Sequence, residues 1–216
     1  MRPQPERLDL IPAADPAVLR RWGVSDCSRV DLASLTDSLA RLQHDEVAPP
    51  SGVDRLVRHI RDRYHHALTA VLGDAIALAT ACEAVHGRDD LWPHGLSDRL
   101  IETLDALQHH QQREDSVVFP LLLADRARAA EAVALMEAEH AGIRARLDGV
   151  LVATGGFRAP PQACVSWRLL YVLCCKVDVD AREQIRLEED ELFRELSGNL
   201  RRSGFVRPQC SNGHED

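Results

Sequence analysis

Apolar residues recur every three to four positions over most of the chain, which is the spacing of amphipathic α-helices. From position 53 onward the pattern divides into four long segments, and no alternating strand pattern competes with it. Stretches with glycine or proline separate most of the segments, and Pro120 is expected to end or kink the second. Four long helices with short connections predict an all-α, up-down-up-down four-helix bundle. The expected helices span residues 53–86, 97–125, 127–154 and 161–200.

Shorter helices are expected before the bundle. Asp15 and Pro16 resemble a helix N-cap followed by proline in the first turn, and Gly23 can end this short helix. A second short helix is expected near residues 32–44, ahead of a composition break with proline and glycine at 48–52. The domain prediction is a small helical domain over 1–50, a bundle over 51–203 and a disordered tail over 204–216.

Composition narrows the class of protein. The 216 residues suffice for one sizeable helical domain and a small attachment. A net charge of -8, with acidic residues spread along the chain, argues against nucleic acid as a partner. No run of about 20 uncharged apolar residues is found, so no membrane partner is expected. The first residues lack a secretory signal, and the six cysteines follow no regular framework, which together predict a cytoplasmic protein with reduced thiols.

Polar side chains interrupt the apolar stripes of the second and third helices. His110 and Glu114 continue the stripe of the second helix, and their spacing of four residues lets both reach one metal ion or one metal pair. His140 falls inside the stripe of the third helix. Taken singly, each has an alternative interpretation, as part of a solvated face or as a core histidine with a protein partner.

The first and fourth helices add two further side chains of this kind. Glu188 lies on the stripe of the fourth helix, one turn after Gln184, and His65 adjoins an apolar face of the first helix, from which His66 points away. Uncompensated buried carboxylates are costly, so their clustering predicts a dinuclear metal site. Carboxylates and imidazoles without suitably spaced cysteines favour iron or manganese over zinc. The candidate ligands are His65, His110, Glu114, His140 and Glu188.

The runs that contain these residues occur in all four helices. They are Arg63-Tyr64-His65, Gln108-His109-His110 with Val118-Phe119-Pro120, Met136 to His140, Ala163 to Tyr171, and Ile185 to Glu188. Over residues 53–196 the chain thereby resembles the hemerythrin-like proteins for repair of iron centres, of the YtfE and ScdA type.

The resemblance implies a non-haem di-iron centre with four histidines and two bridging glutamates. His65, His110 and His140 match three of the histidines, and the two glutamates among the candidate ligands match the bridging carboxylates. Gln184 stands where the family has its fourth histidine, and an amide oxygen is a weaker ligand for iron than an imidazole. Two irons are therefore expected and one is the alternative, with the second position weaker or more open.

Two further features bear on the resemblance: the cysteines before the bundle depart from the family, and Glu139 matches it. The small domain before the bundle has an adjacent cysteine pair in the family, whereas only Cys27 is present here, followed by Ser28. A single thiol cannot perform dithiol chemistry, so a helical docking segment is the simpler interpretation. Glu139 matches an acidic residue that lines access to the family's site, and a solvated helix residue is the alternative.

Three functions follow as hypotheses. The resemblance implies a protein that assists repair of iron–sulfur clusters damaged by nitrosative or oxidative stress, with damaged iron–sulfur proteins as partners. The second hypothesis is a module that binds nitric oxide at an open iron position, and the third is a metal-free interaction bundle. A conventional turnover enzyme is not expected, because the sequence shows no nucleophile with a base and no phosphate-binding loop. Either a monomer or a homodimer fits.

Overall fold

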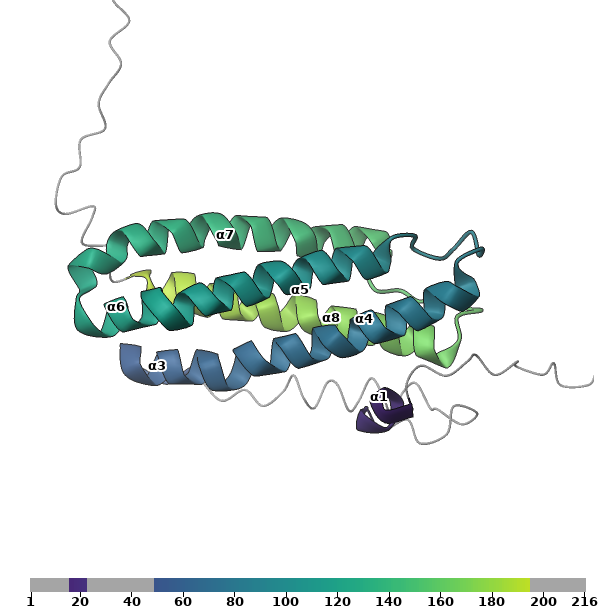
Figure 1. Ribbon diagram of the computed structural model, residues 1–216, viewed down its shortest axis with the longest axis horizontal. Coiled ribbons are helices and arrows are strands. Elements are labelled where there is room, and N and C mark those ends of the chain that lie inside the picture. The colour runs from purple at the N-terminus through teal and green to yellow at the C-terminus, as the bar shows by residue number, and fades with distance from the viewer. Residues whose placement is uncertain (1–15, 23–48, 195–216) are drawn as a thin grey trace, which may run out of the picture.

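The bundle predicted from the sequence is present in the computed structural model, which describes residues 16–22 and 49–194. Four long helical segments run antiparallel, each packed against its chain neighbours and the first packed against the fourth (Figure 1). The described helices are α1 (Pro16–Arg21), α3 (Val53–Ile60), α4 (His66–His86), α5 (Leu96–Arg113), α6 (Phe119–Ala124), α7 (Arg126–Ala153) and α8 (Val165–Leu187). Three π-helical turns join or extend them, namely η1 (Arg61–His65), η2 (Glu114–Val118) and η3 (Glu188–Leu192).

The fourth helix begins later than predicted. The expected start was Pro161, but α8 begins at Val165 because Cys164 is its N-cap, with a sulfur that accepts the Trp167 N–H at 3.4 Å. Proline is tolerated at a first helical position, so the sequence alone did not exclude Pro161. The predicted end near residue 200, the short helix at 32–44 and the tail from 204 lie outside the described residues.

Each π-helical turn contains one of the predicted ligands. His65 is the last residue of η1, Glu114 the first of η2 and Glu188 the first of η3. A π turn inserts one residue into a helix, and such turns are frequent at functional sites. Pro120 is the second residue of α6, which begins directly after η2, so the second helix continues through the proline to Ala124. The helix is thus interrupted by a π turn just before the proline rather than ended by it.

The apolar core consists of two clusters. The larger lies between α4, α5, α8 and the second half of α7, and it includes Leu72, Leu100 and Trp167. The smaller gathers α3, α6, the first half of α7 and the end of η3, and it includes Ile60 and Phe119. The buried polar side chains of the predicted site belong to neither cluster. The bundle expected from the sequence is thus built on two apolar clusters. On the second helix, Ile101 and Val117 are apolar but exposed.

The predicted short helix at Pro16 is present as α1, and it is docked on the bundle. The Arg21 guanidinium donates to both oxygens of Asp74, at 2.8 and 3.0 Å, and the Trp22 indole donates to Asp74 Oδ2 at 2.8 Å. Val18 is buried against the larger apolar cluster. Asp74 itself is buried on α4, so α1 supplies the donors that its charge requires.

Replacing Asp74 by alanine should therefore release α1. Charge-assisted hydrogen bonds that are partly exposed contribute about 1.5 kcal/mol, so the undocked fraction should rise about tenfold. Limited trypsin cleavage after Arg21 measures this fraction. An Asp74→Asn variant retains the shape of the side chain, so its cleavage rate should lie between those of the parent protein and Asp74→Ala. An unchanged cleavage rate in Asp74→Ala would contradict the docking role.

One helical segment passes a test for membrane spans. By length and composition alone, Val53–His86 includes a window apolar enough to cross a membrane, which the sequence analysis did not anticipate. A core helix of a soluble bundle passes the same test, and 44% of this window is buried inside the bundle. The segment also includes Asp74, with the contacts described above. The test is weak evidence for a membrane span.

Candidate metal centre

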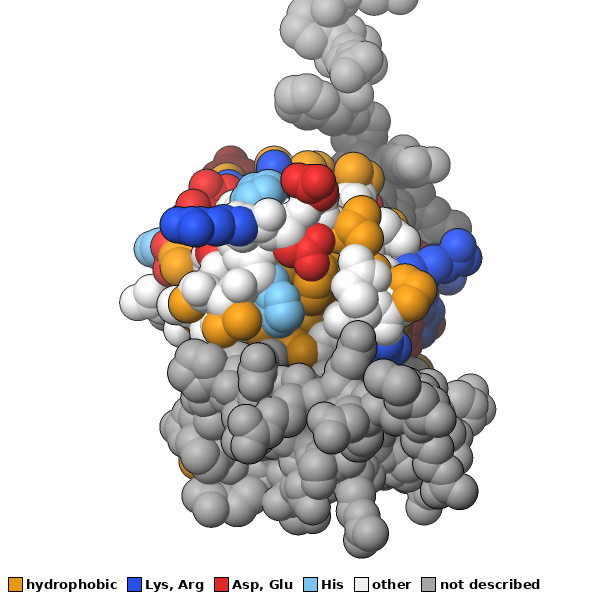
Figure 2. All heavy atoms as spheres, turned by 90° about the vertical axis from the view of Figure 1, so that its right-hand side faces the viewer, with side chains coloured by type: hydrophobic (Ala, Val, Ile, Leu, Met, Phe, Trp, Pro, Cys, Tyr) orange, Lys and Arg blue, Asp and Glu red, His pale blue; other side chains and the backbone are white. Residues whose placement is uncertain are grey.

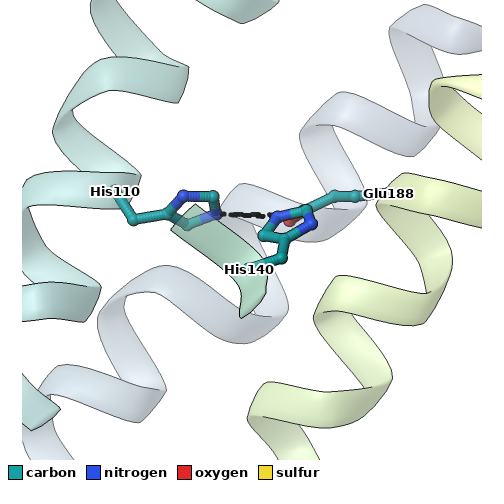
Figure 3. A group of neighbouring side chains, drawn as sticks. All are labelled: His110, His140 and Glu188. Carbon is teal, nitrogen blue, oxygen red and sulfur yellow. Dashed lines mark hydrogen bonds and ion pairs between the residues drawn. The ribbon is translucent and has the colours of Figure 1, made fainter. Parts of the chain in front are cut away.

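All five candidate ligands are buried, and the bundle brings them together in its interior. Among the described residues, two groups of three side chains have ligand atoms that lie within 4.8 Å of one another. One group contains two histidines and the other contains one, and Glu188 belongs to both. The groups are His110, His140 and Glu188 (Figure 3), and His65, Glu114 and Glu188.

The two-histidine group is compact. His140 Nε2 lies 2.9 Å from Glu188 Oε2 and 3.2 Å from His110 Nε2, and His110 Nε2 lies 3.6 Å from the same carboxylate oxygen. The rings come from α5 and α7 and the carboxylate from η3, and all three face one point (Figure 3). Two imidazole nitrogens that face each other across a carboxylate oxygen are a typical arrangement around a metal ion.

The one-histidine group lies on the other side of Glu188. Glu114 Oε2 is 3.3 Å from His65 Nε2 and 3.5 Å from His110 Nε2, so this carboxylate lies between the two groups. Gln184 is also buried here, and its amide donates to Glu188 Oε1 at 2.8 Å and lies 3.5 Å from Glu114 Oε2. Gln184 thus contacts both carboxylates at the position where the family's fourth histidine was expected.

Several polar atoms of this cluster are buried without a hydrogen-bond partner among the described residues. Such atoms are costly, and a native structure rarely contains several together unless an ion or water completes them. Here they belong to two candidate ligands, His65 and Glu114, and to Gln184. The donor set therefore fits a pair of divalent cations. The atoms are His65 Nε2, Glu114 Oε1 and Gln184 Oε1.

A carboxylate lies next to the outer nitrogen of each histidine. His65 Nδ1 is 3.5 Å from Asp115, His110 Nδ1 is 3.1 Å from Glu139, and His140 Nδ1 is 2.9 Å from Glu189. Such partners fix the ring orientation and make the inner nitrogen a better ligand. Each carboxylate is in turn bound by an arginine from the helix of the histidine it contacts, namely Arg61 with Asp115, Arg113 with Glu139 and Arg144 with Glu189.

The three carboxylates and three arginines form an outer layer around the candidate ligands, and most of this layer was not predicted from the sequence. Asp115 and Glu189 were not singled out, and Glu139 was considered only as an access residue or a solvated one. A signal was present, because each of the three acids is adjacent in sequence to a candidate ligand and contacts a histidine of the preceding long helix. The arginines also lie three or four residues from their histidine, which places each pair on one helix face.

Charge in the metal-free cluster is balanced by protons. Burial acts to lower the pKa of His110, but its hydrogen bond to Glu188 and the nearby carboxylates raise it to about 9. Burial acts to raise the pKa of Glu188, but hydrogen bonds from His110 and His140 lower it to about 2. Burial, followed by the charge of Glu188, raises the pKa of Glu114. At neutral pH a metal must therefore displace protons from this cluster, and acid weakens its binding.

Replacing the outer carboxylates should weaken the two positions selectively. A Glu189→Gln change removes the charge that orients His140, and it should lower affinity at the two-histidine position about 10- to 100-fold. Asp115→Asn should do the same at the one-histidine position. Titration with ferrous iron measures both, and Asp190→Asn, an exposed neighbour, serves as the control. If Glu189→Gln and Asp115→Asn each weakened both positions equally, the pairing of Glu189 with the two-histidine position and of Asp115 with the one-histidine position would be wrong.

A groove opens onto the one-histidine position. It has a volume of about 770 Å³ and lies between the first and second long helices. Most of the residues that line it are of polar type, and Gln111 contributes a buried amide nitrogen with no hydrogen-bond partner among the described residues. The residues that line it include His65, His66, Thr69, Gln108, Gln111 and Asp115.

The fold and the cluster define a helical-bundle protein with a cation site of imidazoles and carboxylates. Residues 56–196 match the model of the family described as Hemerythrin HHE cation binding domain. The chain belongs to this hemerythrin family.

Individual relatives have a more specific name than the family as a whole. The chain is 32% identical over 179 residues to the "Iron-sulfur cluster repair protein YtfE" of Musicola paradisiaca (strain Ech703), which covers 79% of each chain. It is also 32% identical over 178 residues to the protein of that name from Yersinia pestis (strain Pestoides F), covering 78% of this chain and 79% of the relative. The resemblance to repair-of-iron-centres proteins inferred from the sequence is confirmed.

Proposed function

We propose that this protein holds non-haem iron in the bundle and assists the repair of iron–sulfur clusters damaged by nitrosative or oxidative stress in the cytoplasm. The relatives named for iron–sulfur cluster repair support this proposal, as do the donor atoms of the cluster. His110, His140 and Glu188 would hold one iron, and His65, Glu114 and Glu188 would hold the second. Bound there, ferrous iron supplies the metal that a damaged cluster has lost.

The proposal rests on the difference between the two-histidine position and the one-histidine position. One position has two histidines, whereas the other has one histidine and the amide of Gln184, and only the second adjoins the polar groove. Iron should bind more weakly at the position with fewer imidazoles. The groove gives an ion at that position a route to solvent, lined by side chains with oxygen and nitrogen atoms. The one-histidine position is therefore the source of iron for a target, and the two-histidine position is retained.

Repair of a damaged enzyme tests this function. A [4Fe–4S] dehydratase inactivated with nitric oxide is incubated anaerobically with the iron-loaded protein, and its activity is followed. Recovery should exceed that given by the same concentration of free ferrous iron. The Glu188→Gln variant, treated in the same way, should give no more recovery than the free iron. No recovery beyond that control by the parent protein would overturn the proposal.

Nitric oxide binding is the second candidate, and the same observation favours it. A ferrous position with one imidazole next to an open groove leaves room for a small ligand. Anaerobic titration of the reduced, iron-loaded protein with nitric oxide should then give one iron–nitrosyl signal per chain. A spectrum without this signal would remove the candidate, and repair without nitrosyl formation would separate the two functions.

A further inference from the structure

A buried hydrogen-bond donor without a partner lies beside the groove at the one-histidine position. Gln111 is 7% exposed and lines the groove, and its amide nitrogen has no acceptor among the described residues. The other end of the same amide is held, because its Oε1 lies 3.5 Å from the Thr69 hydroxyl, which lies 3.1 Å from the carbonyl oxygen of His65. An unpaired buried N–H is costly, so a ligand that brings an acceptor to this nitrogen gains a hydrogen bond.

Side chains with hydrogen-bond donors predominate among the residues that line the groove. Among the described lining residues only Asp115 is acidic, and it is paired with Arg61 at 2.6 Å. Amide and hydroxyl donors bind a carboxylate more strongly than a neutral acceptor, whereas sulfur is a weak acceptor. The groove therefore favours an oxygen-rich anion over a thiol. The donor side chains are those of His66, Thr69, Gln108, Gln111, Gln112 and Ser116.

The groove also reaches the weaker metal position, because His65 lines it. Its volume of about 770 Å³ is typical of sites for small molecules and exceeds what a single carboxylate needs. Carboxylate oxygens are ligands for divalent metals, and a molecule with several of them can replace several protein donors together. One carboxylate of such a molecule can accept from Gln111 while the others face the metal.

We propose that the groove binds small polycarboxylate chelators, such as hydroxyacids of the citrate type, and that these are the immediate acceptors of iron from the one-histidine position. Their role rests on the proposed function, in which iron leaves from this position. Oxygens of the chelator replace the protein donors, protons return to those donors, and the metal stays ferrous, so no oxidant or reductant is needed. Gln111 is a positioning residue, because it orients the chelator without being one of the candidate ligands.

Iron release tests the groove in the full-length, iron-loaded protein. Citrate is the probe, and ferrozine at a fixed concentration reports released iron under anaerobic conditions. If citrate binds in the groove first, the rate of release should rise with citrate concentration and then level off. Each rate is expressed relative to the same protein without citrate. Gln111→Leu removes the donor, so the citrate concentration at half-maximal rate should rise about tenfold or more, as expected for a lost hydrogen bond to a charged group.

Two controls locate the effect. Gln162→Leu makes the same change in the connection between α7 and α8, at the end of the bundle remote from the groove. Figure 2 looks onto this end, where acidic, histidine and apolar side chains lie together, a surface that does not favour a polycarboxylate. This variant should give the citrate curve of the parent. Dithiothreitol, a neutral dithiol, should not accelerate release from the parent as citrate does.

A second measurement does not depend on iron release. In the zinc-loaded protein, which is diamagnetic, the side-chain amide resonance of Gln111 is identified by its loss in Gln111→Leu. Citrate should shift this resonance, and inorganic phosphate at the same concentration should shift it less. Equal shifts with the two anions would overturn the carboxylate assignment, and an unshifted resonance would overturn binding at Gln111.

The release curves provide the remaining outcomes. A parent rate that does not depend on citrate, or a Gln111→Leu curve that matches the parent, would overturn the proposal. Repair of a damaged enzyme that proceeds although citrate has no effect would remove this inference alone. Release that levels off with citrate and depends on Gln111, without any repair, would remove the proposed function alone.

Discussion

A Glu188→Gln variant should lose iron from both positions at once. Glu188 is the residue common to the two ligand groups, and the change keeps its shape but removes the charge shared by the two candidate positions. Replacing an outer partner of a ligand costs about 10- to 100-fold in metal affinity, so loss of a shared charged ligand should cost more than about 100-fold at each position. Iron content after desalting, measured by atomic emission, should fall close to zero.

The control for this variant lies three residues away. Glu191 is exposed on the same π-helical turn, so Glu191→Gln changes the net charge equally and should retain the iron of the parent. Circular dichroism of both variants shows whether the bundle is intact. If Glu188→Gln kept one tightly bound iron, the carboxylate would serve a single position and the shared site would be wrong.

A Gln184→His variant should turn the weaker iron position into a tight one. In the parent protein, a ferrous chelator should remove one iron quickly and the other slowly, because the positions differ in their number of histidines. An imidazole at 184 adds a ligand next to Glu114 and Glu188, and it should slow the fast phase about 10- to 100-fold. If the fast iron is the one given to damaged clusters, repair should slow in proportion.

A histidine in the groove is the matched control. Gln108 lines the groove and is exposed, so Gln108→His adds an imidazole nearby that does not reach the two carboxylates. It should leave both phases of iron release unchanged. A single release phase in the parent, or a fast phase that Gln184→His does not slow, would contradict the asymmetry between the positions.

The helices and the five candidate ligands were predictable because both depend on periodicity. A polar residue on an apolar stripe faces the core whatever its partner, so His110, Glu114 and His140 could be placed inward before any geometry was known. That all five side chains would meet was inferred from their mid-helix positions and is what the structure shows. Their role as ligands stays a prediction until metal is measured.

The outer layer of carboxylates and arginines could not be predicted in the same way. Asp115 and Glu189 lie outside the apolar stripes, and their contacts with His65 and His140 depend on how neighbouring helices are aligned along their length. The start of α8 was likewise placed four residues too early, because the Cys164 N-cap could not be recognised from the sequence. Periodicity identifies the face of a helix but not the height of one helix relative to the next.

The three π-helical turns lie around the metal centre, between the two apolar clusters. A π turn interrupts the regular hydrogen-bond pattern of an α-helix, and three such interruptions lie around this one site. Candidate ligands from all four long helices meet there, so metal bound by them would cross-link the middle of the bundle. If the protein gives iron to a damaged cluster as proposed, it loses this cross-link in the same step.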